Sequence, residues 1–430
     1  MTAARLGLAL AGALFALTPA AAETTYIHAG RVITDPAKPA RSESTVVVTD
    51  GRITEVRDGN VAGPAGVQTL DLGDLTLMPG LIDSHVHLTG DHDDPFYQNF
   101  INTDEYAVAV GLKNARKTLD AGFTTVRDLG GPPEAVFAVR RAIAEGDHPG
   151  PRIVAAGTAI SIIGGHGDVS GARPDVMAAL GGANTCTGPI ECAARVREFS
   201  RAGADVIKIA ATGGVLSQQG RGLGAHFTEE EMRSIVNTAR SLGLKVAAHA
   251  HGDAGIRAAA EAGVASIEHG TFAEDETIRT MKAKGTWFVP TLMAYRGIEE
   301  GLGTGLYTPV VEVKIRQTLD EVGKALSRAY KAGIPIAFGT DAGVFAHGRN
   351  GSEAEMMVQK GGMSPRDVLV SATTGAADLL GIAGETGSIA PGKSADIIAV
   401  EGDPLTDISA VTRVRYVMAA GRGHQIEEAK

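Results

Sequence analysis

Eight short apolar segments, each predicted to form a β-strand, alternate along this chain with helical stretches rich in Ala, Glu and Arg. Parallel strands joined by helices form βα units, and eight such units in succession can close into a barrel. The eight segments are residues 81–88, 124–129, 152–159, 205–211, 245–250, 266–270, 287–292 and 335–340. We therefore predict an α/β fold, a distorted (β/α)8 TIM barrel that spans residues 81–383.

Strand-like, turn-rich segments flank the predicted barrel on both sides. On the amino-terminal side, Asp50-Gly51 is a strong signal for a hairpin turn between two strands. On the carboxyl-terminal side, residues 387–400 and 415–421 are again strand-like. We expect residues 23–80 and 384–430 to fold together as a small β-sandwich domain.

Residues 1–22 have the pattern of a cleavable signal peptide. Arg5 precedes an apolar run of 12 residues, and the small residues Ala20 and Ala22 suit cleavage before Glu23. The apolar run is shorter than the about 20 residues that a membrane-spanning helix needs. We expect a periplasmic or secreted protein without a membrane anchor.

The net negative charge of the chain limits the kinds of molecule that we expect it to bind. The chain has 40 Lys and Arg residues against 50 Asp and Glu residues, a net charge of −10, and it contains no basic run. Nucleic acids and anionic membrane surfaces attract basic patches, so this balance argues against both as partners. A small molecule remains the expected partner.

The chain has two cysteines, Cys186 and Cys192. In an oxidising compartment, two cysteines this close together favour a short disulfide loop over a metal site or a catalytic thiol. Two free, buried thiols remain an alternative.

Ionisable residues stand at the carboxyl ends of the predicted strands, where barrel enzymes carry their reactive groups. His85 and His87 are two positions apart on the first strand, so both side chains project from one face and can bind one metal ion. Such a pair alone is a weak signal, and it gains weight from ligands on other strands. Those are Lys208 on the fourth strand, His249 and His251 on the fifth, His269 on the sixth and Asp341 after the eighth.

With these motifs in this order, the chain resembles the amidohydrolase superfamily in its binuclear-metal form. The resemblance includes the first strand with its Pro-Gly-Leu-Ile-Asp-x-His-x-His motif and the closing segment 387–396, Gly-Ser-Ile-Ala-Pro-Gly-Lys-x-Ala-Asp. It implies that His85, His87 and Asp341 bind one metal ion and that His249 and His269 bind the other. It also implies that Lys208 reacts with carbon dioxide to form a carbamate that bridges both ions. Imidazole and carboxylate ligands suit two divalent ions, zinc best.

The resemblance also implies a mechanism. A water molecule between two divalent ions loses its proton near neutral pH, and the resulting hydroxide attacks a polarised carbonyl group. Asp341 accepts the proton and passes it to the leaving amine. A seryl or cysteinyl nucleophile is not required.

Four loops at the carboxyl ends of the strands, residues 163–167, 212–217, 290–292 and 347–350, look like the branch with Xaa-Pro dipeptidases, imidazolonepropionase-like proteins and ochratoxinases. We expect His166 to be exposed on a glycine-rich loop, where it either polarises the scissile carbonyl or stabilises the loop. His251 either contacts substrate or the sixth-strand ligand, or packs at the rim. The other candidate substrate contacts are Arg221 for a carboxylate, Tyr295 for an apolar group, and His347.

Together these features predict an exported, metal-dependent amidohydrolase that cleaves a C-terminal amide bond, peptidic or N-acyl, and releases an amino acid. Xaa-Pro dipeptides, Xaa-hydrophobic dipeptides and ochratoxin A share this geometry. A lactonase or deaminase on the same scaffold is one alternative, and a non-catalytic metal-binding scaffold is another. The resemblance further implies a homo-oligomer, between a dimer and an octamer.

Overall fold

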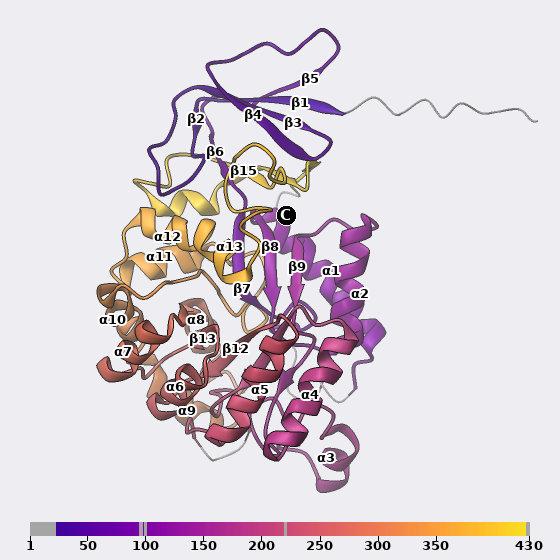
Figure 1. Ribbon diagram of the computed structural model, residues 1–430, viewed down its shortest axis with the longest axis vertical. Helices are drawn as coiled ribbons and strands as arrows, with labels where there is room; N and C mark the ends of the chain where they lie inside the picture. The colour runs from indigo at the N-terminus through magenta and orange to yellow at the C-terminus, as the bar shows by residue number, and fades with distance from the viewer. Residues whose placement is uncertain (1–22, 94–97, 99–100, 219–221, 427–430) are drawn as a thin grey trace, which may run out of the picture.

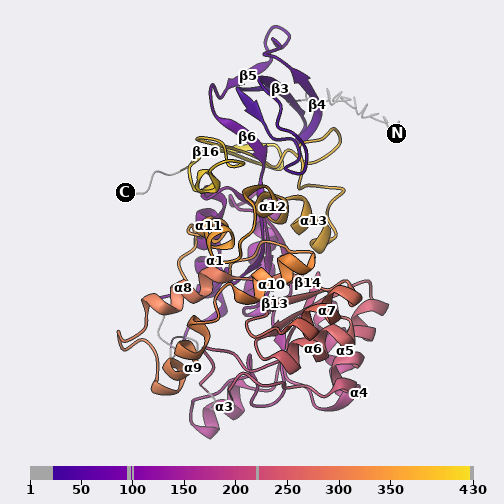
Figure 2. The same ribbon diagram turned by 90° about the vertical axis from the view of Figure 1, so that its left-hand side faces the viewer.

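The computed structural model describes residues 23–93, 98, 101–218 and 222–426. The molecule is elongated, with a β-rich part at one end and a helix-covered barrel at the other (Figures 1 and 2). The predicted signal peptide lies outside the described residues. Among the residues described, no helix combines the length and the apolar character that crossing a membrane requires.

The barrel is built from parallel strands in two sheets, in the orders β7-β8-β9 and β10-β11-β12-β13-β14. The amide of Asp205 donates to the carbonyl of Ala155 at 2.8 Å and joins these sheets. The strands are β7 (Leu81–Val86), β8 (Phe123–Asp128), β9 (Arg152–Ala155), β10 (Ala159–Ile160), β11 (Val206–Ala210), β12 (Lys245–Ala250), β13 (Ser266–His269) and β14 (Trp287–Val289). The predicted TIM-barrel fold is confirmed, with its third strand divided into β9 and β10.

The eighth segment closes the barrel without forming the regular strand that we expect over residues 335–340. Bridges pair Ile336 with Phe288 of β14 and Ala342 with Val86 of β7. Single hydrogen bonds hold the segment on both sides, from the amide of Ala337 to the carbonyl of Phe288 at 3.0 Å and from the amide of Ser84 to the carbonyl of Phe338 at 2.8 Å. A left-handed backbone conformation at Asp341, with φ of 62°, ends the segment. The predicted position of the segment is correct, and its predicted regularity is wrong.

Helices connect the strands and cover the outside of the barrel (Figure 1). The helix α5 shows why these sequences fold as they do: Thr228 and Glu231 form a capping box at its start, and Met232, Ile235 and Val236 are buried. The helices are α1 (Asp104–Asp120), α2 (Pro133–Glu145), α3 (Pro174–Leu180), α4 (Gly188–Ala202), α5 (Glu229–Ser241), α6 (Asp253–Ala262), α7 (Asp275–Lys284), α8 (Leu292–Glu300), α9 (Pro309–Leu319), α10 (Lys324–Ala332), α11 (Ser352–Gln359), α12 (Pro365–Ser371), α13 (Thr374–Leu380) and the 3-10 helix η2 (Ile408–Thr412).

Two further sheets, in the orders β4-β3-β1-β5 and β17-β16-β15-β6-β2, combine both ends of the chain. Buried apolar side chains of both sheets share one core, to which Ile27, Val46, Leu77 and Ile397 belong. The strands are β1 (Thr24–Ala29), β2 (Arg31–Val32), β3 (Ser44–Thr49), β4 (Arg52–Asp58), β5 (Gln68–Asp71), β6 (Thr76–Pro79), β15 (Ile397–Val400), β16 (Val414–Ala419) and β17 (Arg422–His424). The boundaries given above for the domains remain a prediction.

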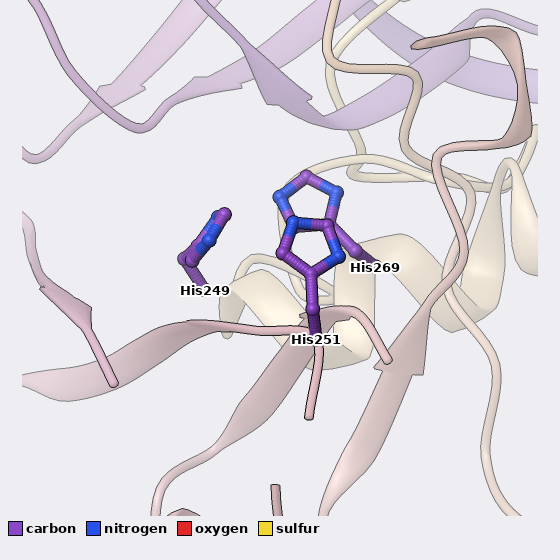
Figure 3. Close-up of side chains that lie close together, drawn as sticks. All are labelled: His249, His251 and His269. Atoms are coloured by element: carbon purple, nitrogen blue, oxygen red, sulfur yellow. The ribbon is translucent and has the colours of Figure 1, made fainter. Parts of the chain in front are cut away.

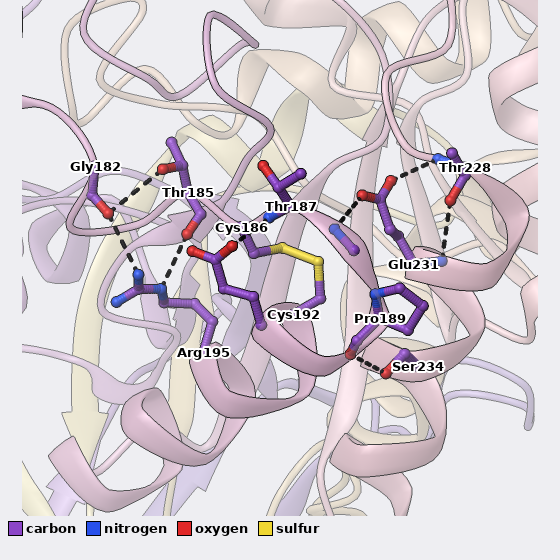
Figure 4. The surroundings of a disulfide bond; sticks show 12 residues. Gly182, Thr185, Cys186, Thr187, Pro189, Cys192, Arg195, Thr228, Glu231 and Ser234 are labelled. Atoms are coloured by element: carbon purple, nitrogen blue, oxygen red, sulfur yellow. Dashed lines mark hydrogen bonds between the residues drawn. A yellow bond between two sulfur atoms is a disulfide. The ribbon is translucent and has the colours of Figure 1, made fainter.

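Cys186 and Cys192 form a disulfide beside the start of α4 (Figure 4), as the sequence favours. Both cysteines are buried, and Cys192 belongs to the first turns of the helix. The amide of Cys186 donates to the carbonyl of Ser161 at 3.0 Å. The disulfide therefore lies between α4 and the loop that follows β10.

We predict that replacing both cysteines by alanine lowers the free energy of unfolding by about 2 kcal/mol, because the bond closes a short loop in the unfolded chain. Urea denaturation of the native protein and of the double variant, both without reductant, measures this difference. Equal midpoints and slopes in the two curves would contradict the prediction.

Candidate metal centre

The candidate site is a cavity of about 330 Å³ at the carboxyl ends of the barrel strands. This volume is in the range that suits a small-molecule ligand. The cavity brings together all six predicted metal ligands and three of the predicted catalytic or substrate-binding residues. These nine residues are His85, His87, His166, Lys208, His249, His251, His269, Tyr295 and Asp341.

The first group of candidate ligands consists of His85, His87 and Asp341, with one ligand atom of each within 4.8 Å of the others. Asp341 Oδ1 lies 3.4 Å from Nε2 of His85 and 3.2 Å from Nε2 of His87. His85 and His87 come from β7, and Asp341 follows the eighth segment. This grouping is the one that the resemblance implies.

The second group consists of His249, His251 and His269, again with ligand atoms within 4.8 Å of one another. Figure 3 shows the rings of His251 and His269 overlapping, with His249 beside them. The His251 and His269 rings stack with centroids 4.9 Å apart. His251 thus contacts the sixth-strand histidine, and its position in this group makes it a third candidate ligand beside the two expected.

Hydrogen bonds hold the imidazoles so that one nitrogen of each remains directed at the cavity. Nδ1 of His85 donates to Glu268 Oε2 at 3.0 Å, and Nδ1 of His87 donates to the carbonyl of Gly130 at 2.7 Å. Nδ1 of His269 lies 2.6 Å from Thr291 Oγ1, and Nδ1 of His251 lies 2.7 Å from Thr271 Oγ1. Metal-binding histidines typically have such partners, which fix the tautomer and the ring orientation. The described donor set therefore fits divalent metal ions.

Lys208 projects from β11 into the same cavity and is 4% exposed. Its Nζ lies 3.4 Å from Nε2 of His85. Burial lowers the pKa of Lys208 to about 8, although the nearby carboxylates of Glu268 and Asp341 oppose that shift. A substantial fraction of neutral amine near physiological pH follows from this value.

Burial favours the neutral form of three candidate imidazole ligands, and metal binding requires that form. Burial lowers the pKa of His85 to about 4, and it lowers the pKa of His249 and His269 well below the usual value. For His87, burial alone would lower the pKa, but the hydrogen bond with Asp341 and its charge raise it. Burial alone would raise the pKa of Asp341, but its interactions with His85 and His87 hold it below its usual range. The cavity therefore offers an ionised carboxylate and nitrogen ligands of which His85, His249 and His269 are neutral.

Two ligands leave their strands in the left-handed region of backbone conformation. His269 has a φ of 71° and Asp341 a φ of 62°. Residues other than glycine rarely adopt this backbone region, because it costs them conformational free energy. Residues that do adopt it cluster at functional sites. Gly339 lies so close to β7 that a Cβ atom there would be 3.2 Å from Cβ of His85 and 2.4 Å from Val289. This close approach brings the Asp341 segment against His85.

Glu268 and Arg127 support the site, and neither is among the residues predicted from the sequence. Glu268 is fully buried, and its Oε1 accepts a hydrogen bond from Nη2 of Arg127 at 2.8 Å. Burial alone would raise the pKa of Glu268, but Arg127 and His85 lower it to about 2. The available signal is an acidic residue inside the buried strand β13, because a buried carboxylate needs a partner.

Two of the remaining predicted site residues line the cavity, and a third lies outside the described residues. His166 lines the cavity but is half-buried instead of exposed, with Nδ1 2.7 Å from Ser217 Oγ. Tyr295 lines the cavity, and its hydroxyl contacts Thr271 Oγ1. Arg221 lies outside the described residues.

His347 is not among the described residues that line the cavity, and its contact with substrate stays a prediction. Its Nδ1 lies 3.0 Å from Thr118 Oγ1, and its Nε2 donates to the carbonyl of His87 at 3.2 Å. Both ring nitrogens are therefore engaged within the protein. The position of His347 supports the backbone of a candidate ligand.

A parallel α/β barrel with two groups of candidate metal ligands in one cavity defines a class of hydrolytic barrel proteins, and comparison with known proteins identifies the family. The amidohydrolase family matches residues 76–423. The chain belongs to the amidohydrolase family and is a hydrolytic enzyme that acts on amide bonds.

Two groups of relatives are similar over nearly the whole chain. Ochratoxinase of Aspergillus niger is 33% identical over 94% of this chain and 87% of its own length. A Xaa-Pro dipeptidase with bound methionine in its active site is 36% identical, with a TM-score of 0.86 over 94% of this chain and 100% of its own. A prolidase in complex with N-methylphosphonate-L-proline is 30% identical, with a TM-score of 0.85 over 94% and 99%.

We predict that Glu268→Gln weakens metal binding by about 10- to 100-fold, because the amide cannot replace the charge that orients His85. Competition with a chromophoric chelator measures the affinity of the variant. Glu230→Gln, an exposed position of α5, is the control and should bind metal as the native protein does. Native affinity in Glu268→Gln would remove the carboxylate from this supporting role.

Proposed function

We propose that this chain is an exported, zinc-dependent amidohydrolase that cleaves a C-terminal amide bond, peptidic or N-acyl, and releases a free amino acid. The observation that carries the proposal is the pair of ligand groups in one cavity, with Lys208 against the first group. The rings of His85 and His269 bring the two groups together, with centroids 5.1 Å apart. Two divalent ions held this way would polarise a carbonyl group and supply a nucleophile from water near neutral pH.

Asp341 is the proton-transferring residue of the proposal. It is the carboxylate among the described residues that line the cavity, and it is ionised. In that state it accepts a proton from water and then delivers it to the leaving amine. His166 and His251 line the cavity, and in this proposal they donate a hydrogen bond to the scissile carbonyl.

Lys208 carries the carbamate in this proposal. Its neutral amine attacks the carbon of carbon dioxide, the nitrogen loses one proton to water, and a carbamate anion forms. The lowered pKa supports this step, because the neutral amine is the reactive form. The new group supplies two oxygen ligands where an ammonium supplies none.

The proposed substrates are Xaa-Pro dipeptides, Xaa-hydrophobic dipeptides and N-acyl amino acids such as ochratoxin A. Apolar side chains make up much of the cavity wall, among them Leu129, Val215, Leu216, Ile298 and Val344. Such a wall suits an apolar amino acid or acyl group. The activities of two relatives, ochratoxinase and Xaa-Pro dipeptidase, support the same substrates.

Export and assembly are part of the proposal. The signal-peptide pattern of residues 1–22 and the disulfide between Cys186 and Cys192 support a periplasmic or secreted location. A homo-oligomer, between a dimer and an octamer, is proposed from the family resemblance.

To test the proposal, the zinc-reconstituted protein is incubated with a pool of Xaa-Pro dipeptides, Xaa-hydrophobic dipeptides, ochratoxin A and lactones. Mass spectrometry then identifies the products. The proposal predicts release of free amino acids, which a chelator abolishes and added zinc restores. Turnover of lactones alone would contradict the amide specificity. Absence of turnover together with absence of bound metal would favour a non-catalytic scaffold.

Lys208→Ala should lose at least one equivalent of metal and most amide hydrolysis, because it removes the carbamate. Metal content by mass spectrometry and the hydrolysis rate are measured on the same preparation. Lys245→Ala, at the exposed start of β12, is the matched control. Native metal content and rate in Lys208→Ala would exclude the bridging role.

Asp341→Asn should retain much of its metal while kcat falls by about 10²- to 10⁴-fold, because the amide cannot transfer the proton. The variant keeps an oxygen ligand and nearly the same shape, so metal content separates the two roles of this residue. A native kcat would remove Asp341 from proton transfer.

A further inference from the structure

Lys314, on α9, is a buried cation outside the metal centre. It is 4% exposed, and its Nζ donates to the carbonyl of Gly214 at 2.9 Å and to the carbonyl of Ser217 at 2.5 Å. Both partners are uncharged, and burial lowers the pKa of Lys314 to about 8. Burying an ammonium against neutral carbonyl groups is costly, so a structural reason for this arrangement is expected.

Lys314 donates hydrogen bonds to the loop after β11, residues 211–217. The same loop contacts the imidazole groups of His249 and His166, which belong to other segments and line the cavity. Nε2 of His249 donates to the carbonyl of Gly213 at 3.3 Å, and Ser217 Oγ lies 2.7 Å from Nδ1 of His166. His166 lies so close to Gly214 that a Cβ atom there would be 2.3 Å from its Nδ1. The two imidazole rings face each other with centroids 4.1 Å apart.

We propose that Lys314 is a positioning residue for His249 and His166 and that it acts through the peptide groups of the 211–217 loop. The inference rests on the proposed function, because it assigns His249 to the second metal and His166 to the substrate carbonyl. Residues 213 and 214 are both glycine, whose backbone has the widest conformational freedom. The two hydrogen bonds from Lys314 fix the carbonyl groups of Gly214 and Ser217, and the carbonyl of Gly213 belongs to the peptide group just before that of Gly214.

The direction of the Gly213 carbonyl matters for the metal. When Nε2 of His249 donates its proton to that carbonyl, Nδ1 carries the lone pair that can bind a metal ion. A rotated peptide group would release Nε2 and allow the other tautomer. Lys314 therefore acts on the ligand geometry of the second metal from outside the cavity.

The helix does not depend on Lys314 for its attachment. Val311 and Ile315 of α9 are buried in an apolar cluster with Val215, Tyr295 and Ile298. Lys314→Met keeps a side chain of similar length in this environment and removes only the donors. The variant is therefore expected to fold with α9 in place.

The experiment compares Lys314→Met, Ser217→Ala and Arg316→Met in the Co²⁺-loaded full-length protein. Arg316 is the matched control, since it lies on the same helix with a side chain 61% exposed. Visible absorption of bound Co²⁺ reports the ligand geometry, chelator competition gives the Co²⁺ affinity, and amide hydrolysis gives kcat and KM. Circular dichroism verifies folding.

We expect Lys314→Met to change the Co²⁺ absorption bands, to weaken Co²⁺ binding about 10-fold and to lower kcat more than it raises KM. Ser217→Ala should lower kcat with unchanged Co²⁺ bands, because it touches only His166. Arg316→Met should match the native protein in every measurement. Lys314→Gln, which keeps an N–H donor, should fall between Lys314→Met and the native protein and replaces Lys314→Met if that variant does not fold.

Two results would overturn the inference. One is a folded Lys314→Met with native Co²⁺ bands, affinity and kcat, and the other is a loss of thermal stability alone. The absorption and affinity measurements do not need a substrate. A protein that hydrolyses none of the tested amides, yet shows the expected Co²⁺ changes, would contradict the proposed substrates and leave the positioning role supported.

Discussion

The closure of the barrel at the seam between β7 and the eighth segment is the constraint on which the site depends. The amide of Asp341 donates to the carbonyl of His85 at 2.7 Å, and the amide of Ser84 donates to the carbonyl of Phe338 at 2.8 Å. The buried carboxylate of Asp83 adds a side-chain brace, since its Oδ2 accepts from Thr340 Oγ1 at 2.6 Å. Together these bonds place a ligand from the end of the barrel sequence beside two ligands from its beginning.

Closing the barrel buries several polar groups away from water, which costs free energy. Hydrogen bonds from side chains behind the candidate ligands offset that cost. Glu268 links His85 to Arg127, and Thr291 holds His269. Because each partner occupies one ring nitrogen, the other is left for the cavity. Residues outside the cavity therefore determine the geometry of the site as much as the residues that line it. In the proposed role of Lys314, such support comes from α9 as well.

The sequence reveals the barrel and the candidate ligands through a local pattern, because five of the eight predicted strands carry ionisable candidate ligands near or just after the carboxyl end. It does not reveal Glu268 or Lys314 as supporting residues, because their partners come from distant segments: Arg127 is 141 positions from Glu268, and Gly214 is 100 positions from Lys314. The contact of His347 with Thr118 is hidden for the same reason, since only the fold brings these two residues together. The end of the eighth segment is not predicted either, because a hydrophobic pattern carries no information on the left-handed backbone conformation of Asp341.

The most direct test of the binuclear centre is anomalous X-ray diffraction at the zinc absorption edge from crystals of the zinc-reconstituted protein. The account predicts two peaks in the cavity. One should lie at about 2.1 Å from ligand atoms of His85, His87 and Asp341, and the other at that distance from His249 and His269. A single peak, or zinc bound elsewhere in the chain, would contradict the central claim that both ligand groups form one catalytic metal centre.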